Sequence, residues 1–191
     1  MDHPAVRTPG AAESRAGLHT ESPAASATDT AVDTEKQPLA QPDLPATRFA
    51  EIDEGAVRVL VHTFYGRIRD DDMLGPVFGQ ALAGRWDPHL EKMVAFWSSI
   101  VLGAKRYRGN VTQAHQPFGH LSGEHFSRWL ALFFDTLDTL FEPQAAFAFA
   151  EPAIRIAESL QLNLFGWEYA LPPAQRALLE SVKRAKARRE E

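Results

Sequence analysis

The sequence predicts an all-α protein, and three observations support this. Apolar residues recur at spacings of three and four over several long windows, which is the period of an amphipathic helix. No window alternates apolar and polar residues as a half-buried strand would. The aromatic residues, 12 Phe, four Trp and three Tyr, all lie between Phe49 and Tyr169. That stretch of about 120 residues is long enough to bury one hydrophobic core.

The chain of 191 residues divides into three parts. Residues 1–46 hold six of the 13 prolines, no aromatic residue and more acidic than basic side chains, so we expect a disordered arm. Residues 47–166 form the folded domain. Residues 167–191 form a basic, helical C-terminal extension, which we interpret as a solvated terminal helix. A docking surface for an anionic partner is the alternative.

The first two helices of the domain are marked by apolar stripes and by their end signals. Residues 51–69 form the first, which the acidic residues 70–72 end. The second begins near Pro88, with Asp87 as its N-cap, and ends at Gly103. The two stripes are Val57, Leu60, Val61, Phe64, Tyr65 and Ile68 in the first helix, and His89, Met93, Phe96, Trp97, Ile100 and Val101 in the second.

Two further helices follow a loop. Residues 103–121 contain several Gly and Pro and two His, and we expect a loop with at most one short helix. A third helix spans Ser122 or Glu124 to Phe141, and a fourth spans Pro143 to Phe165. Pro152 is expected to kink the fourth helix, because proline lacks the amide N–H that the helix needs.

Composition and charge exclude several classes of protein. The formal net charge of −5 argues against a nucleic-acid binder, since neutralising phosphates requires surplus Lys and Arg. The absence of Cys removes disulfides, thiolate nucleophiles and Cys-ligated metal sites. No apolar stretch approaches the roughly 20 residues that span a bilayer, and the first residues lack a signal-peptide pattern. We therefore expect a cytoplasmic protein with neither a nucleic-acid nor a membrane partner.

No dinucleotide, phosphate-loop or HExxH motif occurs. His115, His120 and His125 recur every five residues, so on one helix each would be rotated by about 140° from the last and they could not share one metal ion. What remains is an aromatic helical core with isolated His and Tyr side chains on apolar faces. His89 and Tyr65 are either ordinary core or rim residues or part of a site for a flat apolar cofactor with one axial His, such as haem.

Four blocks of the sequence, in this order, resemble the truncated haemoglobins of group III. They are HTFYGRIRDDDMLGPVF at 62–78, WDPHLEKMVAFWSSIVLG at 86–103, YRGNVTQAH at 107–115 and EHFSRWLALF at 124–133. The resemblance covers about residues 50–165. It implies a truncated globin fold, a two-over-two helical sandwich around one haem b (iron protoporphyrin IX).

The resemblance also assigns roles to individual residues. His115 matches the proximal ligand of the iron. Tyr65 and Trp129 match two distal hydrogen-bond donors, and His89 matches a distal histidine that acts as a gate. The resemblance leaves His120 and His125 as rival ligands and core packing as the alternative for Trp129. The remaining haem-lining positions are Phe78, Met93, Phe96, Trp97 and Tyr107, and Lys92, Arg106, Arg108 and Tyr107 are candidates for the haem propionates by location.

These roles imply a protein that binds dioxygen, nitric oxide and carbon monoxide at the haem iron. Two distal donors would stabilise the partial negative charge of dioxygen on ferrous iron. The resemblance extends to nitric oxide dioxygenation or peroxide chemistry, and either would require a separate reductase because the chain has no flavin or nicotinamide motif. The alternatives are a haem-based sensor and a helical interaction module without haem.

Overall fold

The computed structural model describes residues 44–118, 120–166 and 169–190. These residues contain no strand, and Phe49 and Phe141 form an isolated β-bridge. None of the described helices is long and apolar enough to cross a membrane. Residues 1–43 of the predicted arm lie outside the described part. The all-α prediction is confirmed by seven helices: α1 (Glu54–Asp70), α2 (Leu74–Ala81), α3 (Trp86–Val101), α4 (Val111–His115), α5 (Gly123–Leu140), α6 (Pro143–Phe165) and α7 (Pro173–Glu190).

Helix α1 begins with a side-chain cap and ends in the predicted acidic run. The Asp53 carboxylate accepts a hydrogen bond from the Ala56 amide at 2.7 Å, which satisfies one of the free N–H groups of the first turn. The helix ends at Asp70. All six residues of its predicted apolar stripe are buried, so this helical face points into the core as expected.

Helix α2 was not expected from the sequence. It has only eight residues and includes Gly75, Pro76 and Gly79, which obscure the helical period. Its first turn packs tightly against the end of α1, because a Cβ atom at Gly75 would lie 2.8 Å from the Arg69 carbonyl oxygen. This close approach, which only glycine allows, places Phe78 beside α1.

Helix α3 starts two residues earlier than predicted. Arg85 occupies the N-cap position and Trp86 begins the helix, so the prediction of Asp87 as N-cap is wrong. Asp87 lies in the first turn instead, where a negative charge favours the positive end of the helix dipole. Pro88 lies in the same turn, as predicted. Gly103 follows the helix with φ +67°, a left-handed conformation typical of a C-terminal glycine.

The second half of the described domain follows the predicted order. The predicted loop contains one short helix, α4, whose Asn110 cap accepts a hydrogen bond from the Gln113 amide at 3.0 Å. Helix α5 begins after Ser122, whose side chain forms a reciprocal capping box with His125. Helix α6 has the predicted bounds and continues as one helix through Pro152.

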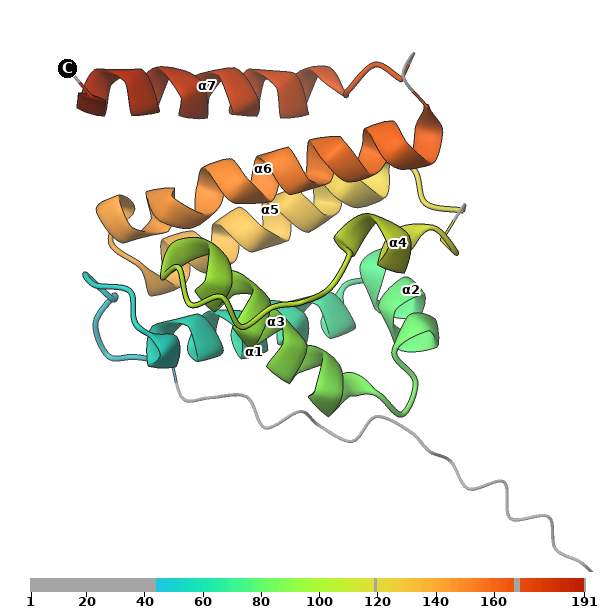
Figure 1. The fold of residues 1–191 in the computed structure, drawn as a ribbon, viewed down its shortest axis with the longest axis horizontal. Helices are drawn as coiled ribbons and strands as arrows, with labels where there is room; N and C mark the ends of the chain where they lie inside the picture. The colour runs from blue at the N-terminus through green and yellow to red at the C-terminus, as the bar shows by residue number, and fades with distance from the viewer. Residues whose placement is uncertain (1–43, 119, 167–168, 191) are drawn as a thin grey trace, which may run out of the picture. The chain divides into compact units, whose positions relative to one another are not determined.

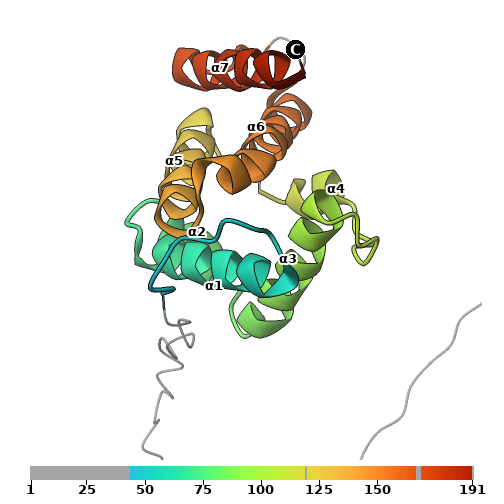
Figure 2. The same ribbon diagram turned by 90° about the vertical axis from the view of Figure 1, so that its left-hand side faces the viewer.

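The helices pack as two pairs. Helix α1 contacts α3 and α5, and α5 packs along α6 (Figures 1 and 2). Helix α4 contacts α6, and α7 packs on α6 on the side away from α1 and α3 (Figures 1 and 2). The pair α1 and α3 therefore faces the pair α5 and α6, which is the two-over-two arrangement. The largest fully buried side chains of this core include Phe64, Phe133, Phe141, Phe149, Leu60 and Leu137.

Candidate functional site

Tyr65 stands at the centre of an aromatic cluster formed by α1, α2 and α3. Its side chain is 5% exposed. Its ring lies 5.0 Å from that of His89 and 6.0 Å from that of Phe78, both in edge-on contact. Burial raises the pKa of the Tyr65 hydroxyl above its ordinary value, so the group stays protonated at neutral pH. This O–H donor has no hydrogen-bond partner in the described part of the chain.

His89 turns a buried nitrogen toward the same cluster. Its Nε2 is inaccessible to solvent and makes no hydrogen bond within the described residues. Burial lowers the pKa of His89 to about 4, and the positive charges of Lys92 and Arg85 lower it further. The His89 imidazole is therefore neutral at pH 7.

Trp129 joins the cluster from α5. Its ring stacks on that of Phe133 at 5.3 Å and meets the edge of Phe64 at 5.5 Å. Phe64 also contacts Tyr65, at 5.2 Å between ring centroids. One core phenylalanine thus joins the two predicted distal donors. The indole N–H of Trp129, like the Tyr65 hydroxyl, has no hydrogen-bond partner among the described residues.

The other predicted lining residues occupy two kinds of surroundings. Trp97 is 3% exposed and stacks on Phe133 at 4.9 Å, so it is packed in the core. Phe78, Met93 and Phe96 are only partly buried and pack against the edge of the core. The sequence predicted one lining role for all four, and the structure separates Trp97 from the other three.

His115 ends α4 with one ring nitrogen engaged. Its Nδ1 lies 2.8 Å from the Val111 carbonyl oxygen. Because a carbonyl oxygen only accepts, Nδ1 carries the proton, and the Nε2 of a neutral ring keeps its lone pair. A metal-bound histidine typically has this arrangement.

The two rival histidines are placed differently. His120 is exposed, and its ring contacts that of Phe118 at 6.2 Å. His125 Nδ1 lies 2.9 Å from the Ser122 hydroxyl and 3.2 Å from the Ser122 amide, in the capping box of α5. Neither histidine has a carbonyl partner at Nδ1. Only such a partner, as in His115, fixes the proton on Nδ1 and leaves the lone pair on Nε2.

Residues 102–110 connect α3 to α4 and border the cluster. Tyr107 packs edge-on against Phe96 at 4.9 Å, and the Lys92 ammonium lies 5.9 Å from the Tyr107 ring centroid. Burial raises the pKa of Tyr107. Arg106, a predicted propionate candidate, forms an ion pair with Glu54 at 2.6 Å. The Ser99 hydroxyl accepts hydrogen bonds from the Arg106 and Tyr107 amides, which fixes this connection to α3.

The sequence analysis missed two groups that position the cluster. Trp86 lies 6.4 Å from Tyr65, and the Arg69 guanidinium lies 5.1 Å from the Trp86 ring centroid. The sequence signal for Trp86 was its position three residues before His89, which places the two side chains on the same face of the helix. Asp71 accepts hydrogen bonds from the Leu74 amide at 2.9 Å and from Arg128 at 2.6 Å. An Asp before a short Gly- and Pro-containing stretch was the signal for this cap.

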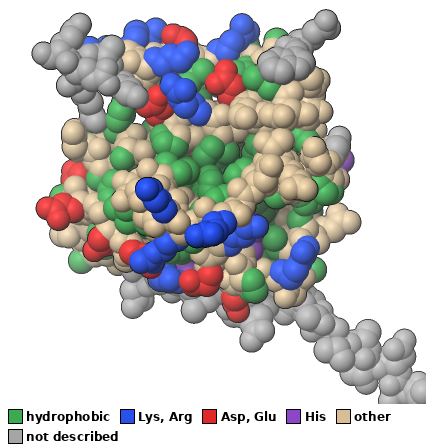
Figure 3. Space-filling model, in the orientation of Figure 1, with side chains coloured by type: hydrophobic (Ala, Val, Ile, Leu, Met, Phe, Trp, Pro, Cys, Tyr) green, Lys and Arg blue, Asp and Glu red, His purple; other side chains and the backbone are tan. Residues whose placement is uncertain are grey.

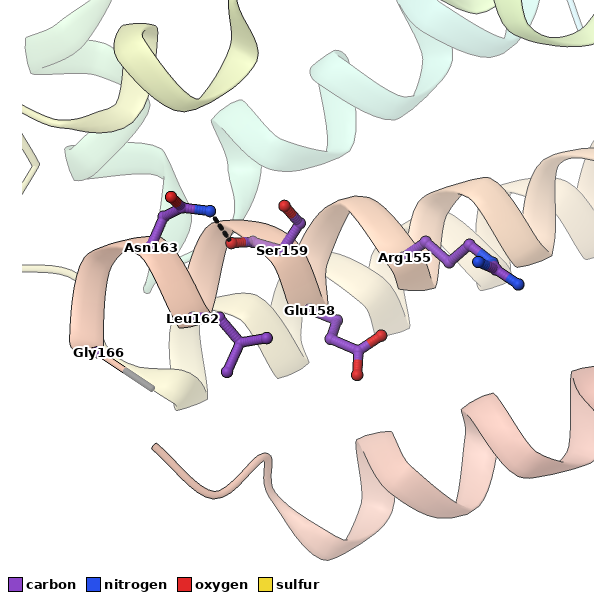
Figure 4. A pocket seen from close by; sticks show the side chains of 6 residues that line it. All are labelled: Arg155, Glu158, Ser159, Leu162, Asn163 and Gly166. Atoms are coloured by element: carbon purple, nitrogen blue, oxygen red, sulfur yellow. Dashed lines mark hydrogen bonds between the residues drawn. The ribbon is translucent and has the colours of Figure 1, made fainter. Parts of the chain in front are cut away.

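A hollow lies away from this cluster, along the second half of α6 (Figure 4). It has a volume of about 450 Å³ and a mixed polar lining. The Asn163 side chain donates to the Ser159 carbonyl oxygen at 2.7 Å within it (Figure 4). None of the predicted site residues lines this hollow. Its lining residues are Arg155, Glu158, Ser159, Leu162, Asn163 and Gly166.

The cluster fits one flat apolar cofactor with an axial histidine. It combines an imidazole with a free Nε2, aromatic rings, and a buried polar atom without a protein partner, the Nε2 of His89. Such unpaired buried groups are costly unless something binds them. No cluster of three or more His, Asp or Glu side chains suited to a metal ion occurs among the described residues.

Comparison with known proteins gives one relative in sequence and one in structure. No family model matches the chain. The group 3 truncated hemoglobin ctb of Campylobacter jejuni is 28% identical over 121 residues, which are 62% of this chain and 95% of the relative. The crystal structure of a group III truncated hemoglobin from Campylobacter jejuni matches with a TM-score of 0.60 and 27% identity, over 65% of this chain and 100% of that one.

These findings confirm the truncated globin fold that the sequence predicted. The match in sequence and the match in structure each take in nearly all of the relative, so the likeness is to a whole globin and not to one motif. Homology of this kind supports a globin-type haem protein. In sequence and in fold, the chain resembles the group III truncated haemoglobins.

Proposed function

We propose that the protein binds haem b and, at the haem iron, dioxygen, nitric oxide and carbon monoxide. The observation that carries this proposal is the His115 and His89 pair. The His115 imidazole keeps its Nε2 lone pair free, and the His89 imidazole, which packs on Tyr65, has a buried Nε2 without a partner among the described residues. His115 would supply the nitrogen that holds the haem iron, and His89 would offer a polar atom to what binds there.

His115 would hold the iron. The hydrogen bond from its Nδ1 to the Val111 carbonyl fixes the ring orientation and makes Nε2 more basic, which strengthens metal ligation. The apolar contacts of the haem would come from the partly buried residues Phe78, Met93, Phe96 and Trp129, from the core residue Trp97, and from Tyr107, which packs on Phe96. Of the propionate candidates, Lys92 and Arg108 have no carboxylate partner among the described residues, whereas Arg106 is paired with Glu54.

Tyr65, Trp129 and His89 would act on the ligand. The haem supplies a ferrous iron that takes up diatomic molecules. The Tyr65 hydroxyl and the Trp129 indole N–H are unpaired donors in a largely apolar pocket, where a hydrogen bond to a partly charged oxygen is strong. The neutral His89 ring packs on Tyr65 and would have to move for a ligand to enter, which supports its role as a gate.

Two reactions suit such a pocket. The dioxygenation of nitric oxide, NO + O₂ + one electron giving nitrate, uses the same two donors, and peroxide cleavage uses them to polarise the O–O bond. Each consumes electrons that the described chain has no flavin or nicotinamide site to supply. We therefore propose a separate reductase as a partner.

Absorption spectroscopy of the purified, haem-reconstituted protein tests the proposal. We expect a Soret band that shifts when the dithionite-reduced protein binds carbon monoxide. The His115→Ala variant should lose the haem or change its spectrum, whereas His120→Ala, at an exposed position in the adjoining loop, should match the parent. A parent protein without a Soret band would refute the proposal. An unaltered His115→Ala spectrum would refute the ligand assignment.

A further inference from the structure

We propose that the protein receives electrons from an acidic one-electron donor protein that docks on a basic face beside the haem pocket. We define the basic face as Lys92, Lys105, Arg106 and Arg108 together with the exposed apolar residues Ile100 and Leu102. The proposal rests on the proposed haem function and names the surface and the chemistry of the reductase partner.

The charge of this region is opposite to that of the whole chain. The formal net charge is −5, but no Asp or Glu occurs between Glu91 and Glu124, where all four cations of the basic face lie. Figure 3 shows several basic side chains, with acidic ones near them, on the face where α3 and its connection to α4 lie. Arg106 is paired with Glu54, and the other three cations form no ion pair with a carboxylate in the described chain. A local positive potential on an acidic protein steers negatively charged partners to one place.

The basic face also carries exposed apolar side chains. Ile100 is 37% exposed and Leu102 is 40% exposed, at the end of α3 just before Lys105. Protein–protein interfaces typically combine an apolar centre with a polar or charged rim. The juxtaposition therefore suits a protein partner better than a small anion, which would not cover the two apolar side chains.

The backbone at Lys105 supports a role for its side chain. Lys105 has φ +49°, and it is the one non-glycine residue with positive φ among those that the structure describes. Glycine adopts this left-handed conformation more easily than any residue with a Cβ atom. A lysine at such a position points to a use for its charge, since local strain of this kind concentrates at functional sites.

The basic face lies where an electron would enter. The connection 102–110 joins α3, which carries His89, to α4, which carries His115, and its Tyr107 packs on Phe96 at the edge of the pocket. In the proposed step, the reduced donor loses one electron and ferric haem iron becomes ferrous. No bond is formed or broken. Docking here would bring the donor beside residues that would hold the haem.

Stopped-flow reduction of the ferric, haem-loaded protein tests this surface. The donor is a reduced plant-type [2Fe–2S] ferredoxin, an acidic protein with a low reduction potential. We expect Lys105→Glu to slow the reduction about threefold to tenfold at low ionic strength. The difference should disappear at high salt, because salt screens the attraction. The matched control is Arg184→Glu, which changes the net charge equally at an exposed position on α7. Ferredoxin should reduce the haem of this variant at the parent rate.

Two more variants at position 105 separate charge from structure. Lys105→Arg keeps the charge and should keep the parent rate. Lys105→Gly removes the charge and also removes the backbone strain of a positive φ. Ferredoxin should therefore reduce its haem more slowly than that of the parent, although the melting temperature of the variant rises. A purely structural role for Lys105 predicts the opposite for glycine, a rate equal to or above that of the parent.

Three results would overturn the inference. The first is equal ferredoxin rates and salt dependence for the parent, Lys105→Glu and Arg184→Glu. The second is an equal loss of rate in Lys105→Glu with the uncharged 5-deazariboflavin radical, which would indicate a damaged pocket. The third is salt-sensitive binding of the parent to vesicles containing anionic lipid, lost in Lys105→Glu, with unchanged ferredoxin kinetics. Failure of the haem proposal is distinguishable, because the parent would then show no carbon monoxide spectrum at all.

Discussion

Tyr65 shows how one side chain combines packing with chemistry. Its ring belongs to the core and contacts Phe78 and His89, while its hydroxyl has no hydrogen-bond partner in the described chain. Tyr65→Phe keeps the ring and removes only the donor. We expect dioxygen to dissociate about tenfold faster from the ferrous variant, since one hydrogen bond contributes about 1 to 1.5 kcal/mol. Flash photolysis or stopped-flow displacement by carbon monoxide measures the rate, and Trp129→Phe should act in the same direction.

An unchanged dissociation rate in both variants would contradict the two-donor account. Phe64→Leu provides the control for packing, because Phe64 contacts both donor rings but carries no donor itself. Phe64→Leu should lower the melting temperature. Any change that it causes in ligand dissociation should affect carbon monoxide as well as dioxygen. Carbon monoxide, which accepts hydrogen bonds weakly, should leave Tyr65→Phe and the parent at similar rates.

His89 makes stability depend on pH in a stated direction. Burial lowers its pKa in the folded state to about 4, against about 6.5 in an unfolded chain. Between these values the unfolded state binds more protons than the folded state, so stability is full above pH 6.5 and decreases as the pH falls toward 4. We expect His89→Gln, which does not titrate, to lose less stability between pH 7 and pH 5. Urea unfolding at the two pH values measures this, and equal losses in parent and variant would contradict it.

At the scale of elements, Asp71 links three helices. Its carboxylate caps α2 through the Leu74 amide and accepts from Arg128 on α5, directly after the end of α1. Burial opposes the charged form, but these hydrogen bonds outweigh burial and lower the pKa of Asp71. The stabilisation is therefore present above about pH 4 and is lost as the pH falls through the lowered value.

We expect Asp71→Ala to reduce the free energy of unfolding by about 1 to 3 kcal/mol, from loss of the cap and of a partly exposed ion pair. Asp72→Ala is the matched control, because Asp72 is exposed and neighbours the same turn. Urea unfolding followed by circular dichroism distinguishes them. The account of α2 fails if the two variants are equally stable.

Helix α7 is joined to the domain by a buried amide pair. Gln175 is 4% exposed, accepts from Gln161 at 2.7 Å and donates to Ser127 at 2.7 Å, so it connects α5, α6 and α7. Gln175→Ala should lower the unfolding free energy by about 1 to 2 kcal/mol, because it leaves buried polar groups short of partners. Arg176→Ala, one residue further and exposed, should have little effect. Equal stability of the two variants would mean that the amide pair does not hold α7.

At the scale of the whole molecule, the sequence predicted best where a long periodic pattern had clear end signals. The α1 stripe, Gly103 after α3 and the bounds of α6 are examples. Helix α2 was not predicted, because the segment has a poor helix propensity and is stabilised by tertiary contact with α1 through Gly75. The division into arm, domain and extension stays a prediction, since residues 1–43 lie outside the described chain.

The candidate site was predictable only in part. Residue types and order indicated His115, Tyr65 and Trp129 through the resemblance, but periodicity alone could not choose among three histidines. The hydrogen bond of His115 to Val111 and the capping role of His125 are three-dimensional facts that distinguish them. The ion pair that engages Arg106 is likewise invisible in the sequence, because it joins residues 52 positions apart.

The proposed function depends above all on His115 as the ligand of the haem iron. Resonance Raman spectroscopy of the dithionite-reduced protein without added ligand tests it most directly, through the iron–histidine stretching band. We expect the band in the parent, in His120→Ala and in His125→Ala, and its loss in His115→Ala. A band that persists in His115→Ala, or that disappears in one of the other two variants, would contradict the account.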